Sequence, residues 1–185
     1  DRICVAYDNM QRFFPAEKII RTGNPVRRDL IDLRGKREQA LAHYGLDPDK
    51  PVILLVGGSL GARSLNEGVR ENYEVLRKAQ HVQLIWQFGK LYAEEFSDCA
   101  ASQLPQVRSL PFLDAMDLAY AAADVVIARA GALTISELEL CGKAAILVPS
   151  PNVAEDHQTR NAEALVAEGS ALMVPDGEAQ KAIPL

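Results

Sequence analysis

The sequence predicts an α/β fold in which helices cover both faces of a parallel sheet. From residue 51 onward, short apolar runs alternate with stretches whose apolar side chains recur at helical spacing. The first run, residues 52–56, is continuously apolar, as expected for a parallel strand that is buried on both faces. Because right-handed crossovers bring every strand-to-helix turn to one edge of such a sheet, we expect a ligand at the carboxyl ends of the strands.

The elements follow in a regular order along the chain. Residues 1–26 lack a clean period and contain turn signals, so we assign them to the end of a preceding domain and a linker. Residues 27–185 form the predicted domain, which we expect to be truncated at its C-terminus, and a helix-favouring stretch (34–43) opens it. We expect strands at 52–56, 82–88, 107–110, 124–128, 144–148 and 171–174, and helices at 65–76, 91–104, 114–123, 134–141 and 156–168, the last capped by Asp156.

Composition restricts the possible functions. The net charge of −5 argues against a nucleic-acid partner, which needs a basic face, but a glycine-rich turn and a helix N-terminus can still bind a small anion. The three cysteines are far apart and odd in number, which is typical of a reduced cytosolic protein. No apolar run is long enough to span a bilayer and no signal peptide opens the chain, so we expect a soluble piece. The chain begins without methionine and stops in mid-pattern, which favours a fragment of a longer protein.

A glycine-rich loop, residues 57–63, follows the first strand directly and opens a helix. Glycines let a ligand approach the backbone closely, the helix start offers free N–H groups, and the Ser59 hydroxyl can donate to a phosphate oxygen. The glycine spacing fits neither a dinucleotide fingerprint nor a P-loop. The alternative is a tight turn that binds nothing.

Two further loops join a strand to a helix at the same predicted edge. Segment 129–137 ends in Glu137, which we place in or near the first helical turn, where a carboxylate is favoured and can accept both hydroxyls of a ribose. Segment 156–161 gathers polar donors at another helix start. In both cases the alternative is a residue set that only stabilises its helix. Arg27, after the turn Gly23-Asn24-Pro25, is either a phosphate ligand or a solvated side chain.

Other patterns are weaker. Asp47-Pro48-Asp49 matches a metal-binding D-x-D pattern but precedes a strand, at the wrong edge of the sheet, so we expect a turn there. The three histidines have no metal-like spacing, and no Ser-His-Asp set or acid pair can be assigned. We therefore expect no metal, no cofactor and no catalytic residue within this chain.

Five motifs in order resemble the MurG family of bacterial glycosyltransferases. They lie at residues 22–27, 57–63, 112–116, 129–137 and 156–162, and the resemblance covers residues 22–174. The resemblance implies the C-terminal, donor-binding domain of a GT-B fold, which consists of two Rossmann-like domains. It also implies transfer of N-acetylglucosamine from UDP-GlcNAc to lipid I, which gives lipid II for peptidoglycan.

The resemblance assigns residues to parts of the nucleotide-sugar. The glycine loop, through Gly58, Ser59 and Gly61, would face the diphosphate with help from Arg27, and the backbone near Leu113 would meet the uracil. Glu137 would bind the ribose beside three residues that lie against the nucleotide, and a polar cluster would contact the sugar. These two sets are Ala132, Leu133 and Thr134, and then His157, Gln158 and Asn161, where His157 replaces the glutamine of relatives.

The resemblance also says what lies outside this chain. It implies an inverting enzyme at the cytoplasmic face of the inner membrane, whose acceptor site, membrane-facing patch and general base belong to an N-terminal domain. This chain alone would then be inactive. Two alternatives stay open: a non-catalytic UDP-sugar-binding subunit that needs a membrane partner, and another GT-B enzyme such as a UDP-sugar epimerase.

Overall fold

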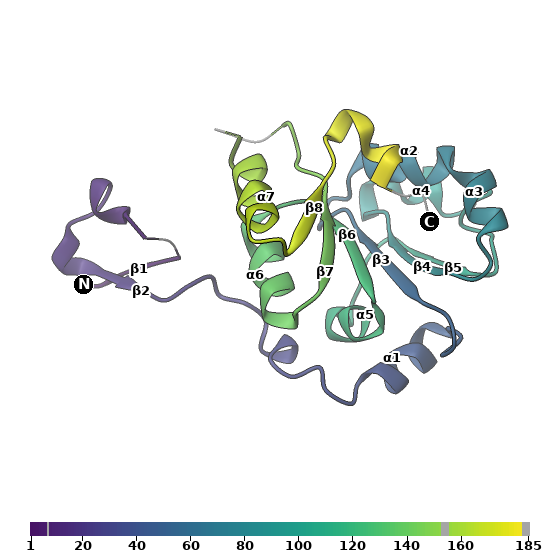
Figure 1. Ribbon diagram of the computed structural model, residues 1–185, viewed down its shortest axis with the longest axis horizontal. Helices are drawn as coiled ribbons and strands as arrows, with labels where there is room; N and C mark the ends of the chain where they lie inside the picture. The colour runs from purple at the N-terminus through teal and green to yellow at the C-terminus, as the bar shows by residue number, and fades with distance from the viewer. Residues whose placement is uncertain (7, 153–155, 183–185) are drawn as a thin grey trace.

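A six-stranded parallel sheet forms the body of the protein in a computed structural model that describes residues 1–6, 8–152 and 156–182 (Figure 1). The last three residues of the expected domain, 183–185, lie outside this description. The strands are β3 (Val52–Val56), β4 (Gln83–Gln87), β5 (Val107–Leu110), β6 (Val125–Ala128), β7 (Ala144–Leu147) and β8 (Ala171–Met173).

The strand order across the sheet is β5-β4-β3-β6-β7-β8. The chain winds from the central β3 to one edge, returns to β6 beside β3, and then winds to the other edge. This is the order of doubly wound, Rossmann-like nucleotide-binding sheets, in which ligands bind where the winding reverses. The expected fold class is confirmed, and all six predicted strands are present with ends within one residue of the expected ones.

Helices cover both faces of the sheet (Figure 1). Alternate residues of β3 point to opposite sides, so Leu54 joins one buried cluster and Leu55 the other. The cluster around Leu54 includes side chains from α1 (Arg37–Tyr44), α5 (Met116–Ala122), α6 (Ala132–Cys141) and α7 (His157–Ala167). The cluster around Leu55 includes side chains from α2 (Arg63–Glu71), α3 (Tyr73–Lys78), α4 (Ala93–Phe96) and the 3-10 segment η6 (Asp176–Ala182).

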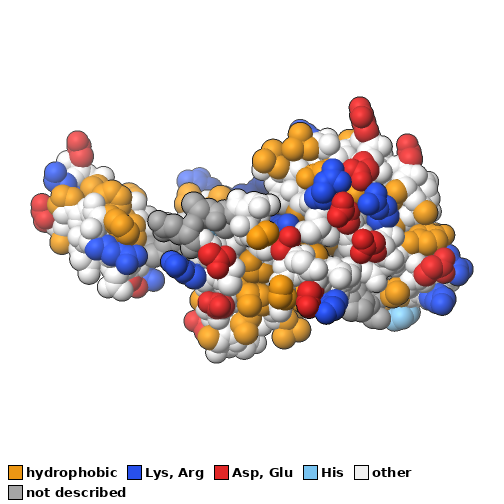
Figure 2. All heavy atoms as spheres, turned by 90° about the horizontal axis from the view of Figure 1, so that it is seen from above, with side chains coloured by type: hydrophobic (Ala, Val, Ile, Leu, Met, Phe, Trp, Pro, Cys, Tyr) orange, Lys and Arg blue, Asp and Glu red, His pale blue; other side chains and the backbone are white. Residues whose placement is uncertain are grey.

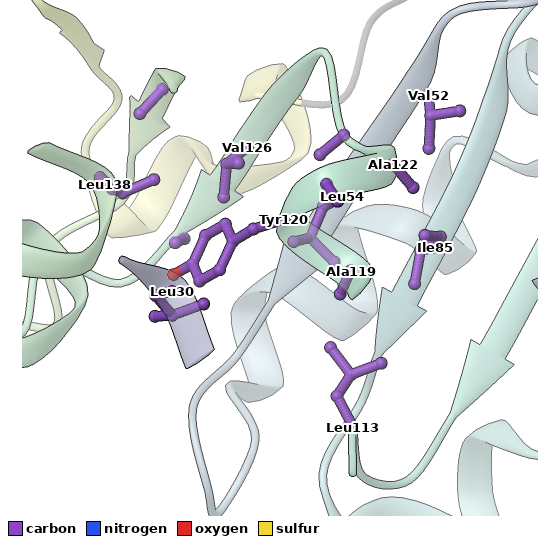
Figure 3. Close-up of a cluster of buried hydrophobic side chains, with 14 of the residues drawn as sticks. Leu30, Val52, Leu54, Ile85, Leu113, Ala119, Tyr120, Ala122, Val126 and Leu138 are labelled. Carbon is purple, nitrogen blue, oxygen red and sulfur yellow. The ribbon is translucent and has the colours of Figure 1, made fainter. Parts of the chain in front are cut away.

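Tyr120 is the largest fully buried side chain in the cluster around Leu54. Figure 3 shows its ring on α5 between the sheet residue Val126, Leu138 of α6 and Leu30 of η3 (Arg28–Leu30). This packing fixes α5 and α6 against the sheet, because each of these side chains is almost completely removed from water.

Residues 1–6 and 8–22 form a small unit beside the main sheet (Figure 1). Strand β1 (Ile3–Val5) pairs in parallel with β2 (Ile19–Arg21), and the 3-10 turns η1 (Met10–Arg12) and η2 (Ala16–Lys18) lie between them. The sequence showed no period here because a three-residue strand is too short for alternation to appear.

Two neighbouring residues of the linker are hydrogen-bonded, one to the small unit and one to a helix of the main sheet, and we call these two residues the anchors. The Thr22 backbone N–H donates to the Val5 carbonyl at 2.9 Å. Two residues later, the Asn24 side-chain amide donates to Ser136 Oγ at 2.9 Å and to the Ala132 carbonyl at 3.3 Å, both on α6. One residue, Gly23, separates the two anchors, and its φ is +74°.

The predicted helix at 91–104 is wrong. The chain makes a 3-10 turn, η4 (Lys90–Tyr92), and the short α4, and then continues in turns. The Ser102 hydroxyl donates to the carbonyls of Ser97 and Cys99 at 2.8 and 2.7 Å. A serine that bonds to nearby carbonyls in this way offers the backbone an alternative to the helix.

The predicted helix at 65–76 is two helices. Asn72 interrupts it, and its side-chain amide donates to the Gly68 carbonyl at 2.9 Å and to the Gln180 carbonyl of η6 at 2.8 Å.

At the opposite edge of the sheet, Asp47 is in the expected turn, because its carboxylate accepts the Asp49 N–H at 3.0 Å.

Candidate functional site

Three loops meet around a cavity of about 630 Å³ at the carboxyl ends of the strands. Ser59 follows β3, Thr134 follows β6 and Gln158 follows β7, and all three line the cavity. Strands β3 and β6 are neighbours at the centre of the sheet, where the winding reverses. The sequence therefore predicted correctly that these loops come together at one edge.

The glycine loop is shaped by close backbone packing. Gly61 has a φ of +81°, and a Cβ added there would lie 2.1 Å from the Phe88 carbonyl oxygen. Gly89 packs against the other side, where an added Cβ would lie 2.5 Å from Gly61 Cα. Gly58 also has a positive φ, +85°, but an added Cβ would meet no atom within 4 Å. Gly61 is thus required for packing, whereas Gly58 is required only for its backbone conformation.

A buried glutamine supports the same loop from the end of β4. Gln87 Oε1 accepts the Gly57 N–H at 3.1 Å, and its Nε2 donates to the carbonyls of Gly58 and Pro111 at 3.0 and 3.3 Å. The side chain is nearly inaccessible to water. Gln87 therefore ties the glycine loop to the segment that follows β5.

Two helices begin at the cavity with N-cap residues that have no side-chain acceptor. Ala62 precedes α2 and Gly131 precedes α6, so neither can cap the first turn. The first N–H groups of both helices are left for another acceptor, and the positive end of each helix dipole favours an anion. These two helix starts suit a phosphate group.

Glu137 lies in the second turn of α6 and is not among the residues that line the cavity. We expected it in or near the first turn, but α6 begins at Ala132, two residues earlier than predicted. The helix dipole therefore supports its charge less than we expected, because that effect falls off within the first turn. The Tyr120 hydroxyl donates to Glu137 Oε2 at 3.1 Å.

The pKa of Glu137 is raised above its usual value, mainly because the carboxyl group is partly buried. The Tyr120 hydrogen bond and the charge of Arg27 oppose this shift, and the charge of Asp29 adds to it. Burial also raises the pKa of Tyr120, so its hydroxyl stays protonated and remains a donor. The carboxylate is thus held in one orientation by a neutral donor from α5.

The polar residues at the start of α7 have different partners. Gln158 lines the cavity, and its Oε1 accepts the Ser150 N–H at 3.0 Å. The Asn161 amide donates instead to the Ala130 carbonyl at 3.0 Å, which supports the loop after β6. His157 is exposed at the first position of the helix. Asp156 is at the N-cap as predicted, but its carboxylate accepts the Thr159 hydroxyl and caps no backbone N–H.

The other expected residues do not line the cavity. Leu113 is 5% exposed and its side chain belongs to the core, so only its backbone is available to a ligand. Ala132 and Leu133 are in the first turn of α6, where Leu133 is 51% exposed. Arg27 is exposed, ion-paired with Asp29 at 3.5 Å, and close enough to affect the charge of Glu137.

The cavity wall also contains a polar cluster that was not predicted from the sequence. Arg129 donates to Asp176 Oδ1 and to the Ser64 hydroxyl, and Ser64 donates to the same Asp176 oxygen at 2.6 Å. Arg129 also donates to the Val148 carbonyl at 3.0 Å. A polar residue directly after a buried strand was a signal for Arg129, but nothing in the sequence connects it with Asp176.

Over residues 1–6, 8–152 and 156–182, no group of three histidine, cysteine or acidic side chains is placed to hold a metal ion. In the same part of the chain, no helix has both the length and the apolar character needed to cross a bilayer. Figure 2 shows basic and acidic side chains interspersed over the visible face.

A doubly wound sheet with a glycine loop, two uncapped helix starts and a cavity at the winding reversal is the architecture of Rossmann-like α/β domains. The chain belongs to glycosyltransferase family 28, because residues 52–183 match the model of the family's C-terminal domain. The match covers the six strands and the loops that line the cavity.

Individual relatives agree with this family. The chain is 52% identical over 187 residues to a Bacteroides fragilis protein named UDP-N-acetylglucosamine–N-acetylmuramyl-(pentapeptide) pyrophosphoryl-undecaprenol N-acetylglucosamine transferase, covering all of this chain and 49% of that protein. A protein of the same name from Parabacteroides distasonis is 53% identical over 97% of this chain and 49% of its own length. The chain thus spans about half the length of the curated relatives it matches.

A solved structure supports the fold. The crystal structure of Acinetobacter baumannii MurG superimposes with a TM-score of 0.65 at 30% identity, over 95% of this chain and 47% of that one. The expected resemblance to MurG and the expected GT-B C-terminal fold are therefore confirmed.

Proposed function

We propose that this chain is the donor-binding half of a glycosyltransferase that moves N-acetylglucosamine from UDP-GlcNAc to lipid I, forming lipid II in peptidoglycan synthesis. The observation that carries the proposal is the meeting of Ser59, Thr134 and Gln158 around one cavity at the winding reversal. The names of relatives about 50% identical over the whole chain support this choice of donor and acceptor.

The site offers a group for each part of the donor. The glycine loop and the uncapped starts of α2 and α6 suit the diphosphate, because they present N–H groups and positive dipole ends. Glu137 suits the ribose, because a carboxylate held by Tyr120 can accept hydrogen bonds from vicinal hydroxyls. Gln158 suits the sugar, because Ser150 fixes its oxygen and leaves its amide group for hydroxyl oxygens.

The remaining assignments rest on the same arrangement. The backbone beside Leu113 is proposed for the uracil, with Ala132 and Leu133 against the nucleotide. His157 and Asn161 complete the sugar cluster, Asn161 by holding the loop after β6. Arg27 assists at a distance, through its charge near Glu137.

The chemistry proposed for the intact enzyme is metal-independent and inverting. The acceptor hydroxyl attacks the anomeric carbon and the bond to the diphosphate oxygen breaks, so UDP leaves with the bonding electron pair. The glycine loop and helix starts stabilise the charge that develops on UDP. A general base and the acceptor site belong to a second domain, which lies against the inner membrane from the cytoplasmic side, and no nucleic acid takes part.

Calorimetric titration with UDP-GlcNAc tests the proposal. We expect saturable binding that EDTA does not change, and at least tenfold weaker binding of GDP- or dTDP-linked sugars. Glu137→Ala should weaken binding, whereas Glu139→Ala, an exposed residue on the same helix, should not. A folded sample that does not bind UDP-GlcNAc would contradict the proposed function.

A longer polypeptide that contains both domains tests the second half of the proposal. It should form lipid II from lipid I and UDP-GlcNAc, whereas this chain alone should not. Binding without transfer by the longer polypeptide would instead favour a binding subunit, and interconversion of UDP-sugars would favour an epimerase.

A further inference from the structure

The charged side chains that line the cavity form balanced pairs. Arg63 pairs with Glu67 at 3.2 Å, and Arg129 pairs with Asp176, which also accepts the hydroxyl of Ser64, the residue after Arg63. The ligand proposed above carries a diphosphate, so a carboxylate in this wall needs an explanation. Asp176 places a negative charge in the same cavity as the glycine loop, where it repels that ligand.

The pair is built into the wall and is not a mobile surface contact. The side chains of Arg129 and Asp176 are 15% and 23% exposed. Arg129 is also fixed by the carbonyls of Val148 and Pro149 at 3.0 and 3.3 Å and by the Ser64 hydroxyl at 2.9 Å. Arg129 thus has three acceptors besides Asp176, so a role for Asp176 in positioning Arg129 alone does not account for its charge.

Asp176 reaches the cavity because η6 packs against α2. Ala179 and Ala182 of η6 are buried in the cluster that contains Leu65 and Val69 of α2, and Asn72 donates to the Gln180 carbonyl at 2.8 Å. Figure 1 shows η6 lying over α2 beside the carboxyl edge of the sheet. The carboxylate is therefore held at a fixed distance from the glycine loop.

We propose that Asp176 is a specificity-determining residue that partly cancels the charge of Arg129, so that the site holds the nucleotide-sugar but releases the free nucleoside diphosphate. This inference rests on the proposed function. A nucleoside diphosphate sugar carries two negative charges, whereas the free diphosphate gains a further charge at its terminal phosphate near neutral pH. Repulsion by Asp176 therefore acts more strongly on the spent nucleotide than on the donor.

The Asp176→Asn variant isolates this effect. Asparagine keeps an oxygen that can accept from Arg129 and Ser64, so the shape of the network is retained while one negative charge is removed. The matched control is Glu178→Gln, which makes the same change of net charge two residues away, in an exposed ion pair with Lys181 at 2.9 Å. If Asp176→Asn does not fold, Asp176→Ser gives the same change of charge.

Three ligands distinguish the possible outcomes: uridine, UDP-GlcNAc and UDP, titrated at low salt. Asp176→Asn should leave the uridine affinity unchanged, tighten UDP-GlcNAc slightly, and tighten UDP most, by about three- to tenfold for one unit charge in a partly solvated cavity. The gain in UDP affinity should disappear near 1 M salt, where interactions between partly solvated charges are screened. Glu178→Gln should change none of the three affinities.

Other results would overturn the inference. An unchanged or weaker UDP affinity in a folded Asp176→Asn sample, or an equal shift for uridine, would show that Asp176 acts through packing and not through charge. A larger gain for UDP-GlcNAc than for UDP would remove the selectivity argument. A wild-type chain that binds uridine and UDP but not UDP-GlcNAc would instead contradict the proposed function.

Discussion

The Tyr120 hydroxyl donates a 3.1 Å hydrogen bond to Glu137 Oε2, from the helix before β6 to the helix after it. Tyr120 is fully buried and Glu137 is partly exposed, so the bond joins the core to the wall of the proposed ribose site. A hydrogen bond to the charged form lowers the pKa of a carboxyl group, which here opposes the effect of burial.

Tyr120→Phe should move the pH dependence of UDP binding. Ribose recognition needs the ionised carboxylate, which is present above the Glu137 pKa and is lost as the pH falls through it. Burial has already raised that pKa, and removal of the Tyr120 donor raises it further, so binding should begin to weaken at a higher pH than in the wild type. Calorimetry over a pH series measures the shift.

Tyr44→Phe is the control for this experiment. Tyr44 is also buried in the same cluster, but its hydroxyl donates to the Ala115 carbonyl at 3.2 Å and not to a carboxylate. Removal of the Tyr44 hydroxyl should lower the stability of the fold and leave the pH dependence of UDP binding unchanged. Identical profiles for Tyr120→Phe and the wild type would show that Tyr120 does not tune Glu137.

Glu137→Gln should reduce the preference for ribose over deoxyribose. The loss of a charge-assisted hydrogen bond corresponds to about tenfold weaker UDP binding or more. The affinity for 2′-deoxy-UDP should fall much less, because that ligand lacks one of the donors. Glu139→Gln, at an exposed position of α6, is the control and should leave both affinities unchanged. If Glu137→Gln weakens the binding of UDP and of 2′-deoxy-UDP by the same factor, Glu137 does not contact the ribose.

Gly61→Ala and Gly58→Ala should differ in stability. Both positions have a positive φ, which costs an alanine about 1–2 kcal/mol. At Gly61 the added methyl group also overlaps the Phe88 carbonyl, so we expect a further loss of about 1–3 kcal/mol there. Urea unfolding measures the two free energies, and equal values would mean that the Gly61–Gly89 contact can relax at no cost.

Gln87→Met should weaken UDP binding although we propose no contact between Gln87 and the ligand. The glycine loop would lose the side-chain acceptor of the Gly57 N–H, which keeps only the longer bond to the Gln87 backbone carbonyl, and the donor to the Gly58 carbonyl, which costs about 1–3 kcal/mol of stability. Gln83→Met is the matched control, because Gln83 is an equally buried glutamine at the opposite end of β4, bonded to Asp47. Both variants should unfold at lower urea concentration, but only Gln87→Met should bind UDP less tightly.

The sequence predicted the strands well because most of them are short runs with an apolar centre between polar residues, as in Val52–Val56. The sequence did not predict the order of the strands in the sheet. Strands β3 and β6 have similar apolar sequences and are separated in the chain by β4 and β5, and nothing in their residues indicates that they pair with each other. The failed helix at 91–104 has a different cause. Its apolar spacing was acceptable, but the Ser102 hydroxyl bonds to the local carbonyls that a helix would use.

The candidate site was predictable where its residues lie in a segment that joins a strand to the following helix. Ser59 and Gln158 belong to segments that start a helix, so the alternation of elements was enough to place them at one edge. Tyr120 was not found, because an aromatic residue in an apolar helix is indistinguishable from any other core residue. Asp176 was not found, because it is 47 residues from Arg129 and the packing of η6 on α2 brings them together.

The neighbouring anchors at Thr22 and Asn24 have a mechanical consequence. Thr22 moves with the two-stranded unit and Asn24 moves with α6, so the backbone torsions around Gly23 form the pivot between them. Gly23 has a φ of +74° and lacks a side chain, so its backbone has more conformational freedom than that of the residues on either side. A glycine pivot absorbs a tilt of the small unit, so the hydrogen bonds from Asn24 to Ala132 and Ser136 leave α6 and the adjoining cavity wall undisturbed while the unit turns.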